Sequence, residues 1–247
     1  MWENYAMTSQ DSKRTKENTK MAKPSEKGNT LAQKKTEEQT RSLPVIIVPG
    51  WGAPHLHTKW VARLLESEGF RAYPLKLPRF GVGDTEENAA ILAREIERVC
   101  SKEGQKRVNL LGMSLGGLIV RIYLEENGPD RIGRAAFIKT PHDGIYTAYP
   151  ASFTKGGRQI RKGSKFIKEL NATKRCSCES PRCLSVYLSR DLIICPAKAA
   201  VLPCGYNLEL EWPVFHWGLV LNPRLIKKAA RFLAGEIPEG AKGPEMA

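Results

Sequence analysis

The sequence predicts an α/β protein with a mostly parallel sheet and helices on both faces. Short runs of consecutive apolar residues, such as 43–48 and 108–111, are typical of strands that are buried on both sides. Segments between these runs carry apolar residues at helical spacing. Strands that alternate with helices in this way form parallel sheets through right-handed crossovers.

Each expected element has its own signal. Residues 43–48 form the first strand, because β-branched side chains run up to a glycine loop at 49–52. The helix at 56–69 ends at Gly69, a suitable C-cap. Asp84 and Glu87 form a capping pattern ahead of the next helix. Further strands are expected at 70–77, 108–111, 132–138, 184–188 and 206–210, with a helix after Ser114 and a last helix from Asn222 to Gly235.

The chain divides into three parts by composition. Residues 1–41 are rich in Lys, Glu, Thr and Gln and lack apolar periodicity, so we expect a disordered polar tail. Residues 42–235 are expected to form one domain, with a cap inserted at about 145–182 where the strand–helix rhythm stops. Residues 236–247 are expected to be a flexible C-terminal tail.

The net charge of +13 favours anionic partners. No nucleic-acid-binding signature accompanies it, so an anionic membrane surface is the macromolecular partner that fits, and plain solubility is the alternative. In the cap, spacings of three and four residues place Arg158, Arg161, Lys165 and Lys168 on one face of a short amphipathic helix, although glycines weaken it as a continuous helix.

The expected location is the cytoplasm, with at most peripheral membrane contact. Residues 1–20 contain no apolar run of signal-peptide length, and no stretch of about 18 apolar residues follows. In that compartment the six cysteines are expected to be free thiols. The spacing of Cys176, Cys178 and Cys183 leaves a zinc site and a disulfide open as lesser alternatives.

The motif most informative about function is Gly112-Met113-Ser114-Leu115-Gly116. It joins a buried strand to a helix, which is the context of a nucleophile elbow. A serine there lies beside free N–H groups at a helix N-terminus, which favour developing negative charge. A glycine-rich turn that merely contains a serine is the alternative.

A serine nucleophile needs a base and an acid that orients the base. Of the four histidines, His216 alone lies downstream of an acid at a strand end, and the order Ser114, Asp191, His216 is the α/β-hydrolase order. Glu209 and Glu211 are rivals to Asp191. His142 and Asp143 are neighbours in sequence and are expected to form loop structure near the site.

The charge of a tetrahedral intermediate needs two backbone donors. We expect the N–H of Leu115, directly after the nucleophile, and the N–H of Trp51, in the loop after the first strand, to form this oxyanion hole.

Residues 44–233 resemble lipase- and esterase-type α/β-hydrolases. The resemblance lies in the stretches 48–52, 112–117, 140–144, 163–171, 189–191 and 216–219. It implies an α/β-hydrolase fold and a serine hydrolase that needs no cofactor. Many lipases carry His-Gly in the first oxyanion loop, whereas this chain has Pro49-Gly50, so no histidine side chain supports that loop.

These observations predict an enzyme that cleaves carboxylic esters of acyl or lipid type through an acyl-enzyme on Ser114. A thioesterase, an acyltransferase, or a non-catalytic lipid-binding protein of the same fold are the alternatives. Five apolar residues of the cap are expected either to line an acyl channel or to form the core of the cap: Phe153, Ile160, Phe166, Ile167 and Leu170.

Overall fold

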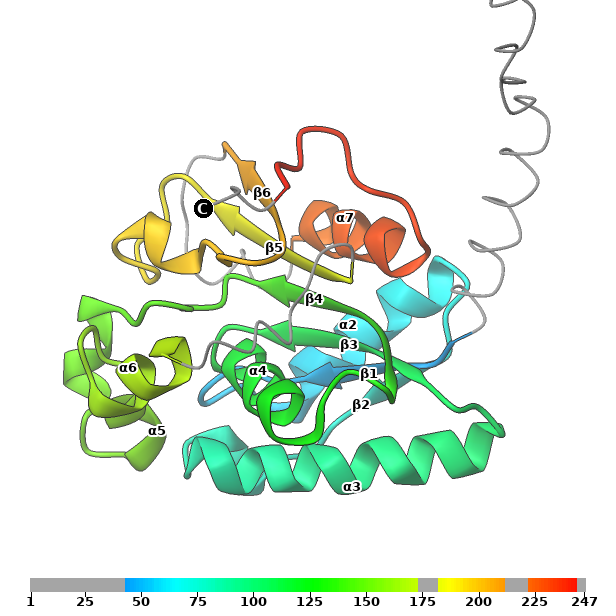
Figure 1. The fold of residues 1–247 in the computed structure, drawn as a ribbon, viewed down its shortest axis with the longest axis horizontal. Helices are drawn as coiled ribbons and strands as arrows, with labels where there is room; N and C mark the ends of the chain where they lie inside the picture. The colour runs from blue at the N-terminus through cyan, green and yellow to red at the C-terminus, as the bar shows by residue number, and fades with distance from the viewer. Residues whose placement is uncertain (1–42, 173–181, 212–221, 244–247) are drawn as a thin grey trace, which may run out of the picture. The chain divides into compact units, whose positions relative to one another are not determined.

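The computed structural model describes residues 43–172, 182–211 and 222–243. Within them, six parallel strands form one sheet in the order β2-β1-β3-β4-β5-β6 (Figure 1). The strands are β1 (Val45–Val48), β2 (Ala72–Pro74), β3 (Val108–Met113), β4 (Ile132–Ile138), β5 (Cys183–Leu188) and β6 (Tyr206–Leu210). The predicted parallel α/β architecture is therefore confirmed.

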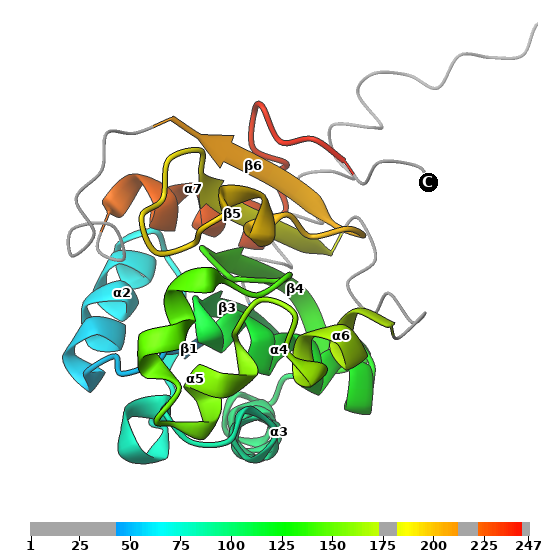
Figure 2. The same cartoon turned by 90° about the vertical axis from the view of Figure 1, so that its left-hand side faces the viewer.

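Helices cover both faces of this sheet, as Figures 1 and 2 show from two directions. The long α3 (Thr85–Glu103) packs with α4 (Leu115–Asn127) on one face, and α2 (His55–Ser67) packs with α7 (Pro223–Leu233) on the other. Asp84 caps α3 by accepting from the N–H of Glu86. No helix in the described ranges is long and apolar enough to cross a bilayer.

Side-chain alternation along the strands divides the interior into two cores. Ile46 and Val48 face α3 and α4, whereas Val45 and Ile47 face α2 and α7. All four side chains are completely buried. The uninterrupted apolar runs in the sequence therefore reflect strands that are covered on both sides.

The register of the strands brings three loops to the same edge of the sheet. Val48 pairs with Gly112, and Met113 pairs with Ile138, so β1, β3 and β4 end nearly level. The segments that follow these strands start from neighbouring points at the carboxyl edge, where parallel sheets place their ligand sites.

The insertion between β4 and β5 begins with a 3₁₀ helix, η3 (Tyr146–Ala151), followed by α5 (Lys155–Gln159) and α6 (Lys165–Ala172). The expected continuous basic face is wrong, because the chain turns between α5 and α6. Ile160 enters the core there and Gly163 adopts a φ of 73°. Arg158 and Lys165 therefore lie on two separate short helices.

The apolar residues of the insertion divide between pocket, core and surface. Ile167 and Leu170 are buried in the core, and Phe166 packs against it. Phe153 is exposed and meets the Trp51 ring edge-on, with 6.3 Å between centroids. Ile160 alone of the five lines the pocket described below, so the expectation of a channel lined by all five is wrong.

Candidate active site

Ser114 lies at the sharp turn between β3 and α4. Its φ of 49° and ψ of −122° fall in a region that residues with a side chain rarely adopt. Its N–H donates to the carbonyl oxygen of Ile138 at the end of the neighbouring strand (2.8 Å). The surrounding strands therefore hold this serine in the backbone conformation that a nucleophile elbow requires.

A glycine allows the turn to lie close to the first strand. A Cβ on Gly116 would lie 2.3 Å from the carbonyl oxygen of Val48, well inside van der Waals contact. Only glycine lets the start of α4 pack against the end of β1, which brings the loop after β1 next to Ser114.

That loop, residues 49–54, carries the expected first oxyanion donor. A Cβ on Gly50 would lie 3.2 Å from both the Met113 carbonyl oxygen and the Cβ of Ser114. The next residue, Trp51, lines the same pocket as Ser114. The N–H groups of Trp51 and Leu115 donate to no backbone oxygen in the described part of the chain, so both donors are available.

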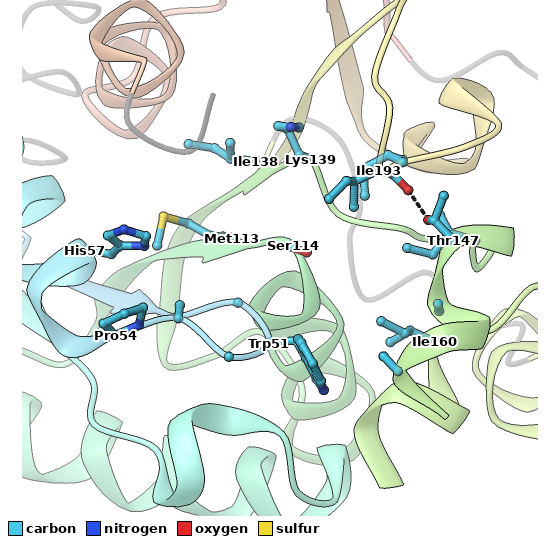
Figure 3. Close-up of a pocket in the computed structure, with 17 residues that line it drawn as sticks. Trp51, Pro54, His57, Met113, Ser114, Ile138, Lys139, Thr147, Ile160 and Ile193 are labelled. Atoms are coloured by element: carbon cyan, nitrogen blue, oxygen red, sulfur yellow. Dashed lines mark hydrogen bonds between the residues drawn. The ribbon is translucent and has the colours of Figure 1, made fainter. Parts of the chain in front are cut away.

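Ser114 opens into a pocket of about 370 Å³. Figure 3 shows the serine between two groups of side chains, with Pro54, His57 and Met113 on one side and Thr147, Ile160 and Ile193 on the other. The second group belongs to the part of the pocket that is lined by the insertion and by the segment after β5, which we call the apolar arm. This arm is lined by Ile145, Thr147, Ala148, Ala151, Ile160, Ile193 and Ile194.

Asp191 follows β5 and has a buried carboxylate. One oxygen, Oδ1, accepts from the N–H groups of Ile193 (2.8 Å) and Ile194 (3.1 Å). The other, Oδ2, lies 2.7 Å from the Nζ atom of Lys139, whose side chain is also buried and which lines the pocket. Asp191 thus fixes the segment that forms one wall of the pocket.

The two rival acids are exposed at the end of the neighbouring strand, β6. Glu209 lies beside the hydroxyl of Tyr187, where burial first and then this carboxylate raise the pKa of the tyrosine. Of the three candidate acids, Asp191 is the buried one and the one that contacts the pocket-lining segments.

The histidines have different positions. His216, the predicted base, lies outside the described residues. His57 lines the pocket of Ser114. His142 is fully buried against Phe137, and its pKa lies well below the usual value, because burial first and then Arg121 disfavour the cation. Asp143 instead pairs with Lys162 at the surface, so His142 and Asp143 do not form a catalytic pair.

Several exposed apolar side chains belong to the segments that line this pocket or contact its lining. We call five of them the apolar rim: Leu56, Tyr146, Tyr149, Phe153 and Leu192. Leu56, Tyr146, Tyr149 and Leu192 lie within or next to pocket-lining segments, and Phe153 packs on Trp51. Exposed apolar side chains grouped in this way mark binding surfaces more often than scattered ones do.

The cysteines differ in part from the expectation of free thiols. Cys204 is disulfide-bonded, whereas Cys100 and Cys195 are free. Cys183 is buried in β5, and Cys176 and Cys178 lie outside the described residues. Among the residues that the structure describes, no three His, Cys, Asp or Glu side chains gather closely enough to hold a metal ion.

Lys139 is the site residue that sequence reasoning missed. It directly follows β4 and has a φ of 51°, a conformation that favours glycine. A charged residue that directly follows a buried strand and precedes Thr140-Pro141 was the available signal. Its partner is 52 positions away in the sequence, so only the fold brings the two together.

Comparison with known proteins agrees with this geometry. The family model of the alpha/beta hydrolase fold matches residues 44–161, which include the elbow and the loop after β1. No curated protein matches the sequence significantly.

Several solved structures share the fold at low identity. Aspergillus fumigatus lipase B is 19% identical, with a TM-score of 0.68, over 85% of this chain and 55% of that one. A Bacillus licheniformis lipase in its mature form is 18% identical, with a TM-score of 0.63, over 78% and 92%. A carboxylesterase from Nitrososphaera gargenis is 15% identical, with a TM-score of 0.53, over 79% and 91%. This chain thus spans about half the length of the Aspergillus lipase.

The chain has the α/β-hydrolase fold, and the predicted resemblance in fold to lipases and esterases is confirmed.

Proposed function

We propose that the protein is a serine hydrolase that cleaves carboxylic esters of acyl or lipid type through an acyl-enzyme on Ser114. The observation that carries this proposal is the strained serine at the end of β3, open to a pocket whose walls are mainly apolar. A backbone strained in this way is maintained only where the surrounding structure enforces it, and such strain concentrates at functional sites.

In the proposed reaction, the Oγ atom of Ser114 attacks the ester carbonyl carbon while His216 accepts the hydroxyl proton. The N–H groups of Trp51 and Leu115 donate to the resulting oxyanion, each worth about 3 kcal/mol in the transition state. The C–O bond to the alcohol then breaks, and the alcohol leaves with the proton from His216. Water then attacks the acyl-enzyme, with His216 accepting its proton and returning it to the Oγ atom of Ser114, and the carboxylic acid is released.

Asp191 is proposed to orient His216. Its burial and its position after β5 support this role over the exposed Glu209 and Glu211. The ammonium group of Lys139 is already engaged with the Asp191 carboxylate. Lys139 is therefore not proposed as the base.

The apolar arm is proposed to hold the acyl chain. Ile160 and Ile194 lie in this arm and carry no polar side-chain atoms. A volume of about 370 Å³ lies in the range of pockets that bind small molecules. A thioester would fit the same pocket, and an alcohol in place of water would make the enzyme an acyltransferase.

The apolar rim, together with the basic composition, supports an anionic lipid surface as a partner. A rim of this kind buries apolar area at an interface, and nearby Lys and Arg side chains add attraction to anionic head groups. Arg158 and Arg161 lie in the same insertion, and Arg161 stacks on the ring of Tyr149.

A panel of p-nitrophenyl esters of increasing chain length tests the proposal. Wild type is expected to hydrolyse them, and Ser114→Ala to lose this activity. Ile160→Trp is expected to shift the preference toward shorter chains, because the indole ring would fill the arm. Ile237→Trp, at an exposed site outside the pocket lining, is the control. Wild-type activity in Ser114→Ala would refute the proposal.

A further inference from the structure

A second cavity of about 230 Å³ lies beside the Ser114 pocket. Its lining comes from the loop after β1, the first turn of α2 and the segment after β2. Ala53 lines both cavities, so the loop that carries Trp51 separates them. A molecule bound at Ser114 therefore has this cavity as its neighbour.

The ionisable side chains that line this cavity are all basic. They are His55, Lys76 and Arg79, and no acidic residue lines it. Neither Lys76 nor Arg79 forms an ion pair in the described part of the chain, whereas Lys155 and Lys162 in the insertion both do. The cavity thus holds positive charge that no carboxylate of the described residues balances.

The imidazole of His55 responds to this excess of charge. Burial first, and then Lys76 and Lys59, lower its pKa. The same cations that disfavour a proton on His55 would favour an anion beside it.

The backbone at the start of α2 also favours an anion in this cavity. α2 begins at His55 after Pro54, with no side chain capping it and no acidic residue in its first turn. The N–H of His57 donates to the Pro54 carbonyl oxygen (2.9 Å), and the positive end of the helix dipole attracts negative charge. The hydroxyl of Thr58 donates to the His55 carbonyl oxygen, so this side chain is already engaged.

We propose that this cavity binds a phosphate group, and that the preferred esters at Ser114 carry such a group on their alcohol part. Two cationic side chains, Lys76 and Arg79, together with the His55 imidazole and an uncapped helix start, suit a multiply charged anion better than a single carboxylate. This inference rests on the proposed ester hydrolysis for the substrate. The binding of phosphate itself does not depend on it.

Binding is tested by NMR of the His55 ring in the Ser114→Ala protein, with inorganic phosphate and with hexyl phosphate as probes. Either phosphate is expected to raise the pKa of His55, because the anion offsets the neighbouring cations. The double variant Lys76→Gln/Arg79→Gln is expected to weaken binding about tenfold or more. Lys198→Gln/Arg224→Gln removes the same charge at exposed sites outside the cavity and is expected to bind like wild type.

The substrate is tested by comparing two acyl esters of equal chain length, one with a phosphate on the alcohol and one neutral. Wild type is expected to prefer the phosphate ester, and Lys76→Gln/Arg79→Gln to lose about tenfold of that preference in kcat/KM. If inorganic phosphate inhibits hydrolysis of the phosphate ester competitively and leaves hydrolysis of the neutral ester unchanged, the phosphate group that the cavity binds belongs to the substrate. Equal effects of free phosphate on both esters would identify an effector site and overturn the substrate assignment.

Failure of the phosphate site and failure of the proposed ester hydrolysis give different results. Equal binding by wild type and the cavity variant, or no response of His55, overturns the phosphate site even if neutral esters are hydrolysed. Phosphate binding without hydrolysis of any ester refutes the proposed function and the substrate assignment, and leaves only an anion site.

Discussion

The ammonium group of Lys139 lies 2.7 Å from the carboxylate of Asp191, and both side chains are almost completely buried. The pair joins the end of β4 to the segment after β5. Lys139 also lines the pocket that contains Ser114. A buried charge without its partner is costly, so this pair makes the two segments depend on each other.

Lys139→Met is therefore expected to destabilise the protein by roughly 3–5 kcal/mol, because it leaves the Asp191 carboxylate buried without its cation. Urea unfolding measures this loss. Lys165→Met breaks an exposed pair with Glu169 (3.6 Å) and is expected to cost less than about 0.5 kcal/mol. Equal losses in the two variants would show that the buried pair has no special role.

The loop at Gly50 links packing to catalysis. Gly50→Ala places a methyl group 3.2 Å from Met113 and Ser114, so the loop must shift by a few tenths of an ångström. Ester hydrolysis is expected to fall about tenfold in kcat/KM while the melting temperature changes little, because Trp51 moves with the loop. Gly83→Ala is the control, since a Cβ there meets nothing within 4 Å. Unchanged activity in Gly50→Ala would contradict the assigned oxyanion loop.

The buried His142 makes stability depend on pH. Its folded-state pKa is lowered by burial and by Arg121, so below the unfolded value of about 6.5 the unfolded chain binds the proton more readily. The contribution of His142 is therefore complete above pH 6.5 and is lost as the pH falls below it.

His142→Phe removes this proton site and keeps an aromatic ring against Phe137. Urea unfolding between pH 7.5 and 5 is expected to show a smaller loss of stability in the variant than in wild type, by up to about 1.4 kcal/mol per pH unit below 6.5. Identical slopes for the two proteins would mean that His142 becomes protonated within the folded state.

The apolar rim predicts binding to lipid surfaces. Phe153→Ser/Leu192→Ser is expected to reduce sedimentation with anionic liposomes, because two exposed apolar side chains leave the interface. Ile237→Ser changes an exposed apolar residue outside the rim and should behave like wild type. Binding is expected to fall with added salt. Equal sedimentation of all three proteins would argue against the rim as the contact surface.

The elbow could be predicted from sequence because its signal is local. A buried strand, two glycines and the start of a helix lie within a few residues of Ser114, and each is set by short-range sterics. The parallel sheet was predictable for the same reason, since each strand and helix has its own pattern.

The details of the pocket depend on contacts between distant segments. Periodicity did not indicate that Ile160 would line the pocket while Ile167 enters the core, because the turn between α5 and α6 decides this. The burial of Lys139 runs against the usual exposure of lysine and follows from Asp191, far along the chain. His216 lies outside the described residues, so its role stays a prediction.

The mass of the intact protein after reaction with a fluorophosphonate tests most directly whether Ser114 is the nucleophile. A single adduct is expected on wild type, located on the peptide that contains Ser114. Ser114→Ala should give no adduct, and His216→Ala should react far more slowly because the hydroxyl loses its base. Ser189→Ala, at a serine after β5, should react like wild type. An unmodified wild-type protein, or an adduct that persists in Ser114→Ala, would contradict the assignment of Ser114 as the nucleophile.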